Sequence, residues 1–208
     1  KLISVGLFPL MVVFGGLFQI IFLPDTPVFC FSSTILMILF YIQSMESQIS
    51  LDPLTGLNNR THLYRYIAQE STLYRENRLT YVVMIDINDF KSINDTYGHS
   101  NGDKALVITA DSLRKAIGEA GMPAFLGRFG GDEFIIIAHP NEKAEMGKLE
   151  ETIRKCLHEG CRLNNAPFDI TVGIGYDLLN RDISDTFESC MEKADKKLYI
   201  NKNEIKEK

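Results

Sequence analysis

A pair of glycines followed by two acids is the pattern in this chain most suited to chemistry. Asp132 and Glu133 come directly after Gly130 and Gly131. A ligand can approach glycine backbone closely because glycine carries no side chain, and carboxylate oxygens are the ligands that Mg²⁺ prefers. The pattern therefore indicates a metal-assisted site for a phosphate group.

A further acid, Asp86, stands near the end of residues 81–87, a run of strand length that is otherwise apolar and rich in β-branched side chains. A polar segment, residues 88–95, follows it. A buried strand that delivers an acid beside a polar loop commonly builds a functional site. Taken alone, Asp86 would more often cap the following turn. Beside the glycine motif, we interpret it as a partner of Asp132 in holding a metal ion.

The elements that must position these acids can be predicted from the apolar pattern. Apolar residues flank the glycine motif on both sides, at 124–126 and 135–137. This predicts a hairpin over residues 125–138 that carries the acids at its tip. Alternating apolar residues predict another strand over 168–176.

Helices are predicted where apolar residues recur at helical spacing. The four sets are Leu63, Ile67 and Leu73; Leu106, Ala110, Leu113 and Ile117; Met146, Leu149, Ile153 and Leu157; and Phe187, Met191, Ala194 and Leu198. Gly118 and Gly121 are expected to end the second helix. The order strand, helix, strand, strand, helix, strand is ferredoxin-like. We therefore predict an α+β fold with an antiparallel sheet flanked by helices.

Taken together, the motifs resemble the GGDEF family of diguanylate cyclases. The signature itself occupies residues 130–134, and residues 52–60 look like the family's opening motif. Segments 86–91, 94–99, 102–103 and 194–199 match the motifs between and after these two. The resemblance covers roughly residues 52–202, and it implies the family's nucleotidyl-cyclase fold.

The resemblance also implies an activity. The family joins two GTP molecules into cyclic di-GMP and releases two pyrophosphates, across a homodimer in which each subunit supplies one half-site. Two Mg²⁺ ions, with Mn²⁺ as an alternative, would clamp the attacking and leaving oxygens. By resemblance, Asp86, Asp132 and the carbonyl of Ile87 are the metal ligands. Glu133 is assigned to metal binding or to activation of the ribose hydroxyl, which completes the catalytic set.

Substrate-binding residues are carried over in the same way. Lys91 matches the family's phosphate lysine, and Asn94 and Asp103 match the pair that recognises guanine. Asn88 and Phe90 lie in the same segment as Lys91 and are included in the substrate site. The alternatives are a solvated lysine at 91, a plain turn residue at 94 and a helix N-cap at 103.

The end of the chain departs from the family pattern. Lys202 matches a lysine that reaches the triphosphate, and the alternative is a solvated basic run. The glycine and arginine that usually follow are replaced by Ile205 and Lys206. Lys206 keeps the charge but loses the bidentate fork of arginine, so weaker binding of the phosphates is expected.

Another departure lies upstream of the signature. Many members carry an inhibitory product site with the pattern Arg-x-x-Asp. At that spacing this chain has Gly121 and Ala124, so neither charge is present. We expect no product inhibition through that site.

Composition limits the competing functions. The 208 residues carry 27 acids and 22 bases, a formal net charge of −5, which argues against a nucleic-acid partner. The four cysteines match no zinc spacing. Two alternatives to an active cyclase stay open. One is a module that senses GTP or binds a partner without turnover, and the other is a nucleotidyl cyclase that makes a different cyclic nucleotide.

The first 44 residues differ sharply from the rest. Residues 2–24 carry no charge, and residues 5–23 are almost wholly apolar and long enough to cross a bilayer. Residues 24–27 form a turn signal, and residues 28–43 are again uncharged. We predict two transmembrane helices in residues 1–44. The alternatives are a buried helical hairpin and a signal peptide.

The predicted organisation is a membrane region at 1–44, a linker at 45–51 and a catalytic domain at 52–208. Because GTP is a cytoplasmic substrate, we expect a multi-pass protein of the bacterial cytoplasmic membrane with its catalytic domain facing the cytoplasm. The chain does not begin with Met, so we expect it to be part of a longer protein.

Overall fold

The structure is a computed structural model that describes residues 14–22, 30–31, 33–35, 37–38, 41, 50–72, 78–180 and 186–206. The chain divides into two compact units, residues 1–49 and residues 50–208.

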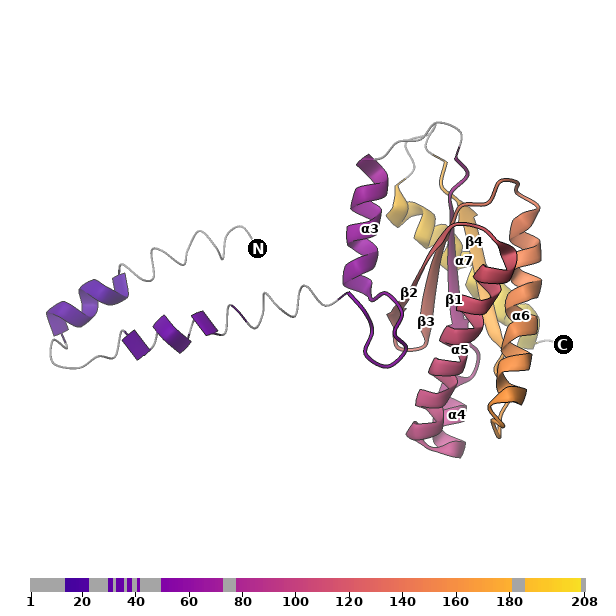
Figure 1. Cartoon of the computed structure of the whole chain (residues 1–208), viewed down its shortest axis with the longest axis horizontal. Coiled ribbons are helices and arrows are strands. Elements are labelled where there is room, and N and C mark those ends of the chain that lie inside the picture. Colours follow the sequence, from indigo (N-terminus) through magenta and orange to yellow (C-terminus); the bar gives the residue numbers. More distant parts are fainter. Residues whose placement is uncertain are drawn as a thin grey trace. The chain divides into compact units, whose positions relative to one another are not determined.

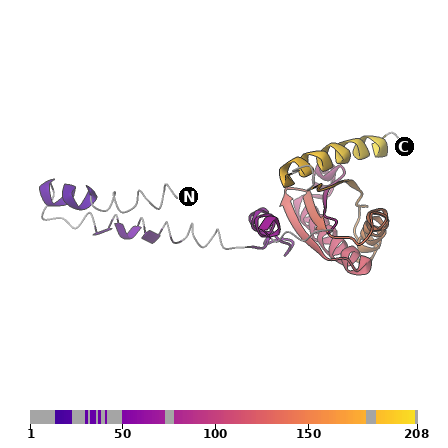
Figure 2. The same ribbon diagram turned by 90° about the horizontal axis from the view of Figure 1, so that it is seen from above.

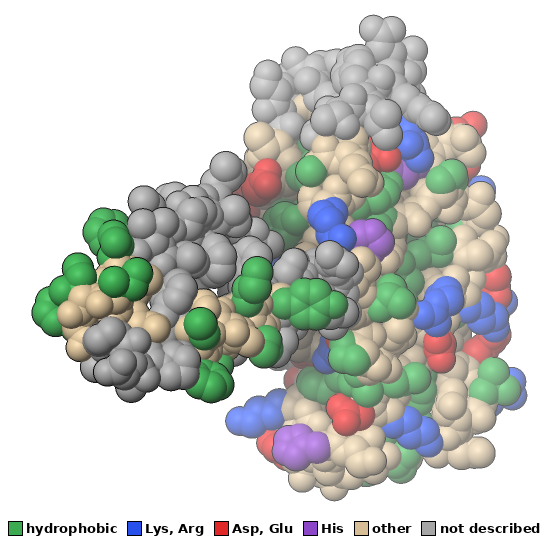
Figure 3. Space-filling view, turned by 60° about the vertical axis from the view of Figure 1, so that its left-hand side comes forward, with side chains coloured by type: hydrophobic (Ala, Val, Ile, Leu, Met, Phe, Trp, Pro, Cys, Tyr) green, Lys and Arg blue, Asp and Glu red, His purple; other side chains and the backbone are tan. Residues whose placement is uncertain are grey.

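In the first unit, residues 14–22 are helical. Large apolar side chains of this helix are exposed, among them Phe14, Ile20 and Phe22 (Figure 3). Among the helices of the described residues, none has both the length and the apolar character needed to cross a membrane. Much of the two predicted spans, and residues 45–49 of the predicted linker, lie outside the described residues.

The described residues of the second unit form a four-stranded sheet with strand order β2-β3-β1-β4, in which every neighbouring pair is antiparallel. Its elements are α3 (Arg60–Thr72), β1 (Tyr81–Ile87), α4 (Phe90–Tyr97), α5 (His99–Ala120), β2 (Ala124–Gly130), β3 (Glu133–Ala138), α6 (Glu145–Leu163), β4 (Val172–Leu178) and α7 (Phe187–Lys206) (Figure 1). This order and pairing confirm the predicted ferredoxin-like α+β fold.

The sheet separates two hydrophobic cores because successive strand side chains point to opposite faces. On β1, Val83 and Ile85 pack with α5 and α6, whereas Val82 and Met84 pack with α3 and α7. Figure 2 shows α7 on one side of the sheet, with α5 and α6 on the other. Asp86 continues the Val82 and Met84 series, so it belongs to the face that α7 covers.

The predicted boundaries hold in part. The 81–87 strand and the hairpin are confirmed, but α5 runs through Gly118 to Ala120. Gly121 then ends the helix in a left-handed conformation, with φ 65° and its N–H bonded to the carbonyls of Ile117 and Gly118. The last strand begins only at Val172, because the apolar residues before it are buried without joining the sheet. Leu73 lies outside the described residues.

Glycines on β4 let α7 lie close to the sheet. A Cβ on Gly175 would lie 2.1 Å from the backbone nitrogen of Leu198 and 2.2 Å from the carbonyl oxygen of Ala194. No side chain fits at that distance, so the backbone of α7 rests directly on β4. This close approach carries the C-terminal turns of α7 to the end of the sheet where Asp86 lies.

Candidate active site

The acids of the candidate site are brought together by the pairing of β1 with β3. In this antiparallel register Asp86 is the direct partner of Glu133, so their side chains emerge side by side. Asp132 precedes Glu133 at the hairpin turn, and its carbonyl accepts the N–H of Ile87 at 3.4 Å. The structure therefore gathers Asp86, Ile87, Asp132 and Glu133. Their roles as metal ligands and catalytic groups stay predictions.

The carboxyl groups of this site are partly buried and lie close enough to repel one another when ionised. Burial raises the pKa of Asp86, a hydrogen bond from Lys202 opposes this rise, and the charge of Asp132 adds to it. Burial likewise raises the pKa of Glu133, and the charges of Asp86 and Asp132 raise it further. Like charges held close together disfavour ionisation of each carboxyl group. The site therefore favours any cation that can enter it.

A lysine supplies such a positive charge. The Nζ of Lys202, on α7, donates a hydrogen bond to Oδ1 of Asp86 at 2.5 Å, and both side chains are largely shielded from solvent. The sequence predicted Lys202 as a phosphate contact and not as a partner of Asp86. Lys206 ends α7, but its side chain lies outside the described part of the structure.

The acids fit a divalent cation that takes few protein ligands. Among the described residues, no group of three or more His, Cys, Asp or Glu side chains has the geometry of a complete metal site. Two observations nevertheless favour a cation: the neighbouring acids add to the raised pKa of Asp86 and of Glu133, and an ammonium group already neutralises Asp86. Mg²⁺ suits this arrangement because it keeps several waters and binds substrate phosphates.

The two predicted guanine-binding residues lie close together where α4 meets α5. Gly98, with φ 86°, separates the helices and donates its N–H to the carbonyl of Asn94. A Cβ on Gly102 would lie 1.9 Å from Oδ1 of Asn94, so this amide packs on bare backbone next to Asp103. The structure thus brings an amide and an exposed carboxylate together, as recognition of a guanine edge requires.

The segment between β1 and α4 holds the other predicted substrate residues. Lys91 lies in the first turn of α4 with its side chain exposed, whereas Phe90 packs against the core. Nδ2 of Asn88 donates to the hydroxyl of Thr171 at 3.1 Å. Its Oδ1 is buried and has no hydrogen-bond partner among the described residues. These placements leave Lys91 the most accessible of the three to a ligand.

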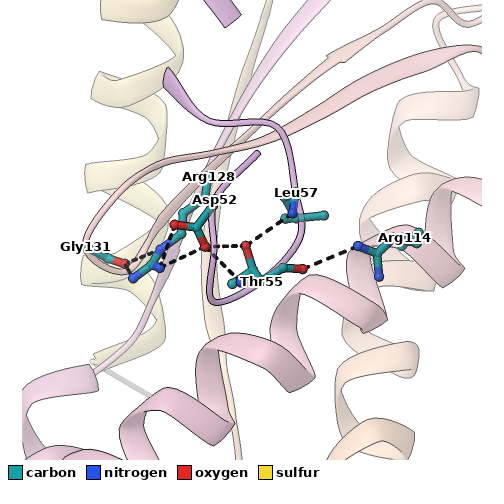
Figure 4. Close-up of polar contacts among 6 residues, drawn as sticks. All are labelled: Asp52, Thr55, Leu57, Arg114, Arg128 and Gly131. Carbon is teal, nitrogen blue, oxygen red and sulfur yellow. Dashed lines mark hydrogen bonds and ion pairs between the residues drawn. The ribbon is translucent and has the colours of Figure 1, made fainter. Parts of the chain in front are cut away.

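Sequence reasoning gave no role to Arg128, which anchors the hairpin turn. Its Nε and Nη2 donate to the carbonyl of Gly131 at 2.9 and 2.7 Å, and its Nη1 contacts both carboxylate oxygens of Asp52 at 3.1 and 3.2 Å (Figure 4). The amide and hydroxyl of Thr55 also donate to Asp52. We call Asp52, Thr55, Arg128 and Gly131 the hairpin clamp. It ties the turn that carries Asp132 to the segment before α3.

The signal for the clamp was present in the sequence. Asp52 opens the motif at 52–60, and Arg128 lies just before the glycine motif. Their opposite charges are compatible with an ion pair. Gly131 adopts φ 50°, a left-handed conformation that favours glycine, and its carbonyl is the acceptor for the guanidinium. The second glycine of the motif therefore serves the turn itself as well as ligand access.

Comparison with known proteins agrees with this geometry. The family model for the GGDEF domain, described as "Diguanylate cyclase, GGDEF domain", matches residues 49–208. The chain belongs to the GGDEF domain family. The sequence-based recognition of the family is thereby confirmed.

Two relatives and one solved structure illustrate the likeness. The chain is 34% identical to "Diguanylate cyclase DgcP" of Pseudomonas aeruginosa, over 76% of this chain and 23% of that protein. It is 36% identical to "Probable diguanylate cyclase DgcC" of Escherichia coli, over 71% of this chain and 39% of that protein. The chain thus spans well under half of either relative. The GGDEF domain of DgcB from Caulobacter crescentus, solved with c-di-GMP, has a TM-score of 0.63 and 28% identity, and the match covers 75% of this chain and 91% of that domain.

The hairpin clamp leads to a prediction about stability. Burial disfavours the ionised form of Asp52, but hydrogen bonds from Thr55 and Arg128 outweigh it, so the pKa of Asp52 lies below its usual 3.8. A carboxylate with a lowered pKa stabilises the fold above its unfolded-state pKa, and this contribution is lost as the pH falls through the folded-state value. Asp52→Asn should therefore lower the free energy of unfolding by about 1–3 kcal/mol at pH 6. The difference from the parent should shrink below about pH 4.

Denaturant unfolding at several pH values measures this. Asp111→Asn is the matched control, because Asp111 pairs with Arg114 on an exposed surface and should change stability by less than about 0.5 kcal/mol. An Asp52→Asn effect that is absent at pH 6, or that persists undiminished at pH 2.5, would contradict the assigned role of the clamp.

Proposed function

We propose that this chain is a diguanylate cyclase that condenses two GTP molecules into cyclic di-GMP and two pyrophosphates. The observation that carries the proposal is the pairing of Asp86 with Glu133, with Asp132 at the adjoining turn and Lys202 reaching the same point. The names of the relatives DgcP and DgcC, and the cyclic di-GMP bound to the DgcB domain, support it.

In this proposal the pair at the α4–α5 junction binds the base. The carboxylate of Asp103 accepts hydrogen bonds from N1–H and the 2-amino group of guanine, and the amide of Asn94 contacts the remaining edge. Lys91, Lys202 and Lys206 neutralise the triphosphate, and N–H groups at the start of α4 face the phosphates. The nucleotide then extends from the helices toward the acids at the ends of β1 and β3.

The acids act at the reacting end of the nucleotide. Asp86, Asp132 and the carbonyl of Ile87 would hold the divalent cation, Mg²⁺ with Mn²⁺ as an alternative. When bound, this cation supplies charge neutralisation at the phosphates and acidifies the ribose hydroxyl. Glu133 lies directly opposite Asp86, and in this proposal its carboxylate accepts the proton of the 3′-hydroxyl. The 3′-oxygen then bonds to the α-phosphorus of the second GTP, and pyrophosphate leaves with the electrons of the broken bond.

The reaction requires a second copy of the chain. One chain offers one base pocket and one acidic site, whereas the product contains two nucleotides joined by two new bonds. Two half-sites must therefore face each other in a homodimer, and each positions its GTP for attack on the other. Because dimerisation controls assembly of the site, the rate should rise more steeply than in proportion to protein concentration.

A GTP-binding module without turnover is the second candidate. One observation favours it: Lys206 stands where the family pattern has arginine. In this alternative, Asn94 and Asp103 still bind guanine, but the phosphates are held too loosely for in-line attack. Binding of GTP without product would therefore distinguish the module from the enzyme.

The test of the proposed activity is incubation of the chain with GTP and Mg²⁺ at several protein concentrations, with products identified by mass. Cyclic di-GMP should form, and Asp132→Asn should lower its rate at least about 100-fold because a carboxylate at the reacting centre is lost. Asp111→Asn is the matched control and should react like the parent. Bound GTP with no product would favour the sensor module, and a cyclic mononucleotide would contradict the assigned reaction.

We also propose that residues 1–44 anchor the protein in the bacterial cytoplasmic membrane as a multi-pass segment, with the catalytic unit on the cytoplasmic side. The uncharged stretches at 2–24 and 28–43 support this. So do the exposed apolar side chains of residues 14–22, because contiguous apolar surface marks membrane or partner contact. The short linker would then carry motion of the second span to the hairpin clamp.

Alkaline extraction of bacterial membranes tests the anchor. The parent chain should remain in the membrane pellet and dissolve only in detergent. Phe14→Lys should reduce the retained fraction, since a charge near the middle of a span costs roughly 3 kcal/mol. Leu163→Lys is the control, because Leu163 is exposed on α6 of the catalytic unit. Release of the parent by alkali alone would contradict the anchor.

A further inference from the structure

The outer edge of β4 is bound by side chains from two helices. Nη1 of Arg154, on α6, donates to the carbonyl of Val172 at 3.0 Å. The N–H of Ile174 donates to Oδ1 of Asn201 at 3.1 Å, and Nζ of Lys197 donates to the carbonyl of Tyr176 at 3.1 Å. The unpaired N–H and C=O groups of an edge strand can form hydrogen bonds with a further strand. Here three of them instead fix α6 and α7 to the sheet.

Asn201 lies at the centre of this arrangement. Its Oδ1 accepts both the N–H of Ile174 and a hydrogen bond from Nη2 of Arg154 at 3.3 Å. Both partners can only donate, so the orientation of the amide is determined by its neighbours. Glu150 accepts from Arg154 at 2.9 Å and holds the guanidinium from the other side. The amide therefore fixes the turn of α7 that carries the next residue, Lys202.

Bare backbone on β4 gives Lys202 its path to Asp86. Gly173 is the register partner of Asp86 on the neighbouring strand. A Cβ at this position would lie 2.6 Å from Cγ and 3.2 Å from Cε of Lys202. The aliphatic stem of the lysine thus lies across Gly173, and its ammonium group reaches the acid beyond.

We propose that Asn201, braced by Arg154, is a positioning residue that holds Lys202 at the acidic end of the site. Without this contact the turn of α7 that carries Lys202 would lose its hydrogen bond to β4, and the ammonium group would lose its place beside Asp86. What Lys202 does there, contact with the triphosphate, rests on the proposed function. The positioning itself is a property of α6, α7 and β4.

A matched pair of substitutions tests the role of Oδ1 of Asn201 as a hydrogen-bond acceptor. Asn201→Leu keeps the approximate size of the side chain but accepts no hydrogen bond, whereas Asn201→Asp keeps both acceptor contacts. Crystal structures should show Lys202 on Asp86 in the parent and in Asn201→Asp, and displaced in Asn201→Leu. Arg154→Met with Arg154→Lys provides a second pair if Asn201→Leu does not fold, with displacement of Lys202 again expected only in the methionine variant.

Binding of a non-reactive GTP analogue with Mg²⁺ then tests whether Asn201 acts through Lys202. Asn201→Leu should weaken binding about tenfold, the scale of one charge-assisted contact, and Asn201→Asp should restore it. In the Lys202→Met background, Asn201→Leu should cause no further loss, because residues that act as one unit are not additive. Equal losses in both backgrounds would mean a general structural role and would overturn the proposal.

The proposed function can fail independently of the positioning role of Asn201. If the parent binds no GTP analogue, the cyclase and sensor assignments both fail, while the crystal structures still decide the positioning. Lys202 remaining on Asp86 in Asn201→Leu and in Arg154→Met would overturn the proposal regardless of nucleotide binding. Displacement of Lys202 in either variant, without change at the hairpin clamp, would support it.

Discussion

The register of β1 against β3 is the constraint on which the candidate site depends. It places Asp86 opposite Glu133 and brings the hairpin turn with Asp132 to the same end of the sheet. A slip of one residue would move the buried side chains of β1 to the wrong face, so the two hydrophobic cores fix the register strongly. The acids are thereby held together despite mutual repulsion. Burial of Ile85 and Ile135 on opposite faces thus sets the position of the chemistry.

Besides the strand register, two polar contacts hold the candidate site in place. The hairpin clamp fixes the turn from outside the sheet, through Arg128 and Asp52. Lys202 neutralises Asp86 from the side of α7. In the proposed mechanism the same lysine also contacts the triphosphate, so Lys202 would contribute positive charge both to the acids and to the substrate. The clamp also joins the turn to the segment before α3.

Much of the fold could be predicted because its signals are local. Apolar periodicity defined β1 and the long helices, and the flanked glycines defined the hairpin. The end of α5 was ambiguous because Gly118 lies within the helix and only Gly121 needs a positive φ. The start of β4 was wrong because Phe168 and Ile170 are buried without strand pairing. Alternating apolar residues indicate which side chains are buried. Whether they form a strand also depends on hydrogen bonds to a neighbouring strand.

The site was predictable in its residues but not in its contacts. Asp86, Asp132, Asn94 and Asp103 could be selected by motif. The structure brings the acids together at one place, and it brings Asn94 and Asp103, predicted to bind the base, together at another. The ion pair of Arg128 with Asp52 spans 76 positions, and that of Lys202 with Asp86 spans 116. Such contacts follow from the packing of α7 and the path of the chain before α3, which no local pattern contains.

In the proposed function, the acids at the ends of β1 and β3 form a cation-dependent site for GTP. The most direct measurement is the thermal unfolding midpoint of the parent and of Asp132→Asn, with Mn²⁺ and a non-reactive GTP analogue added separately and together. A ligand that binds only the folded state raises this midpoint. We expect the midpoint of the parent to rise most with both ligands, and Mn²⁺ to have no effect on the midpoint of Asp132→Asn. An equal rise in both proteins, or none in the parent, would contradict it.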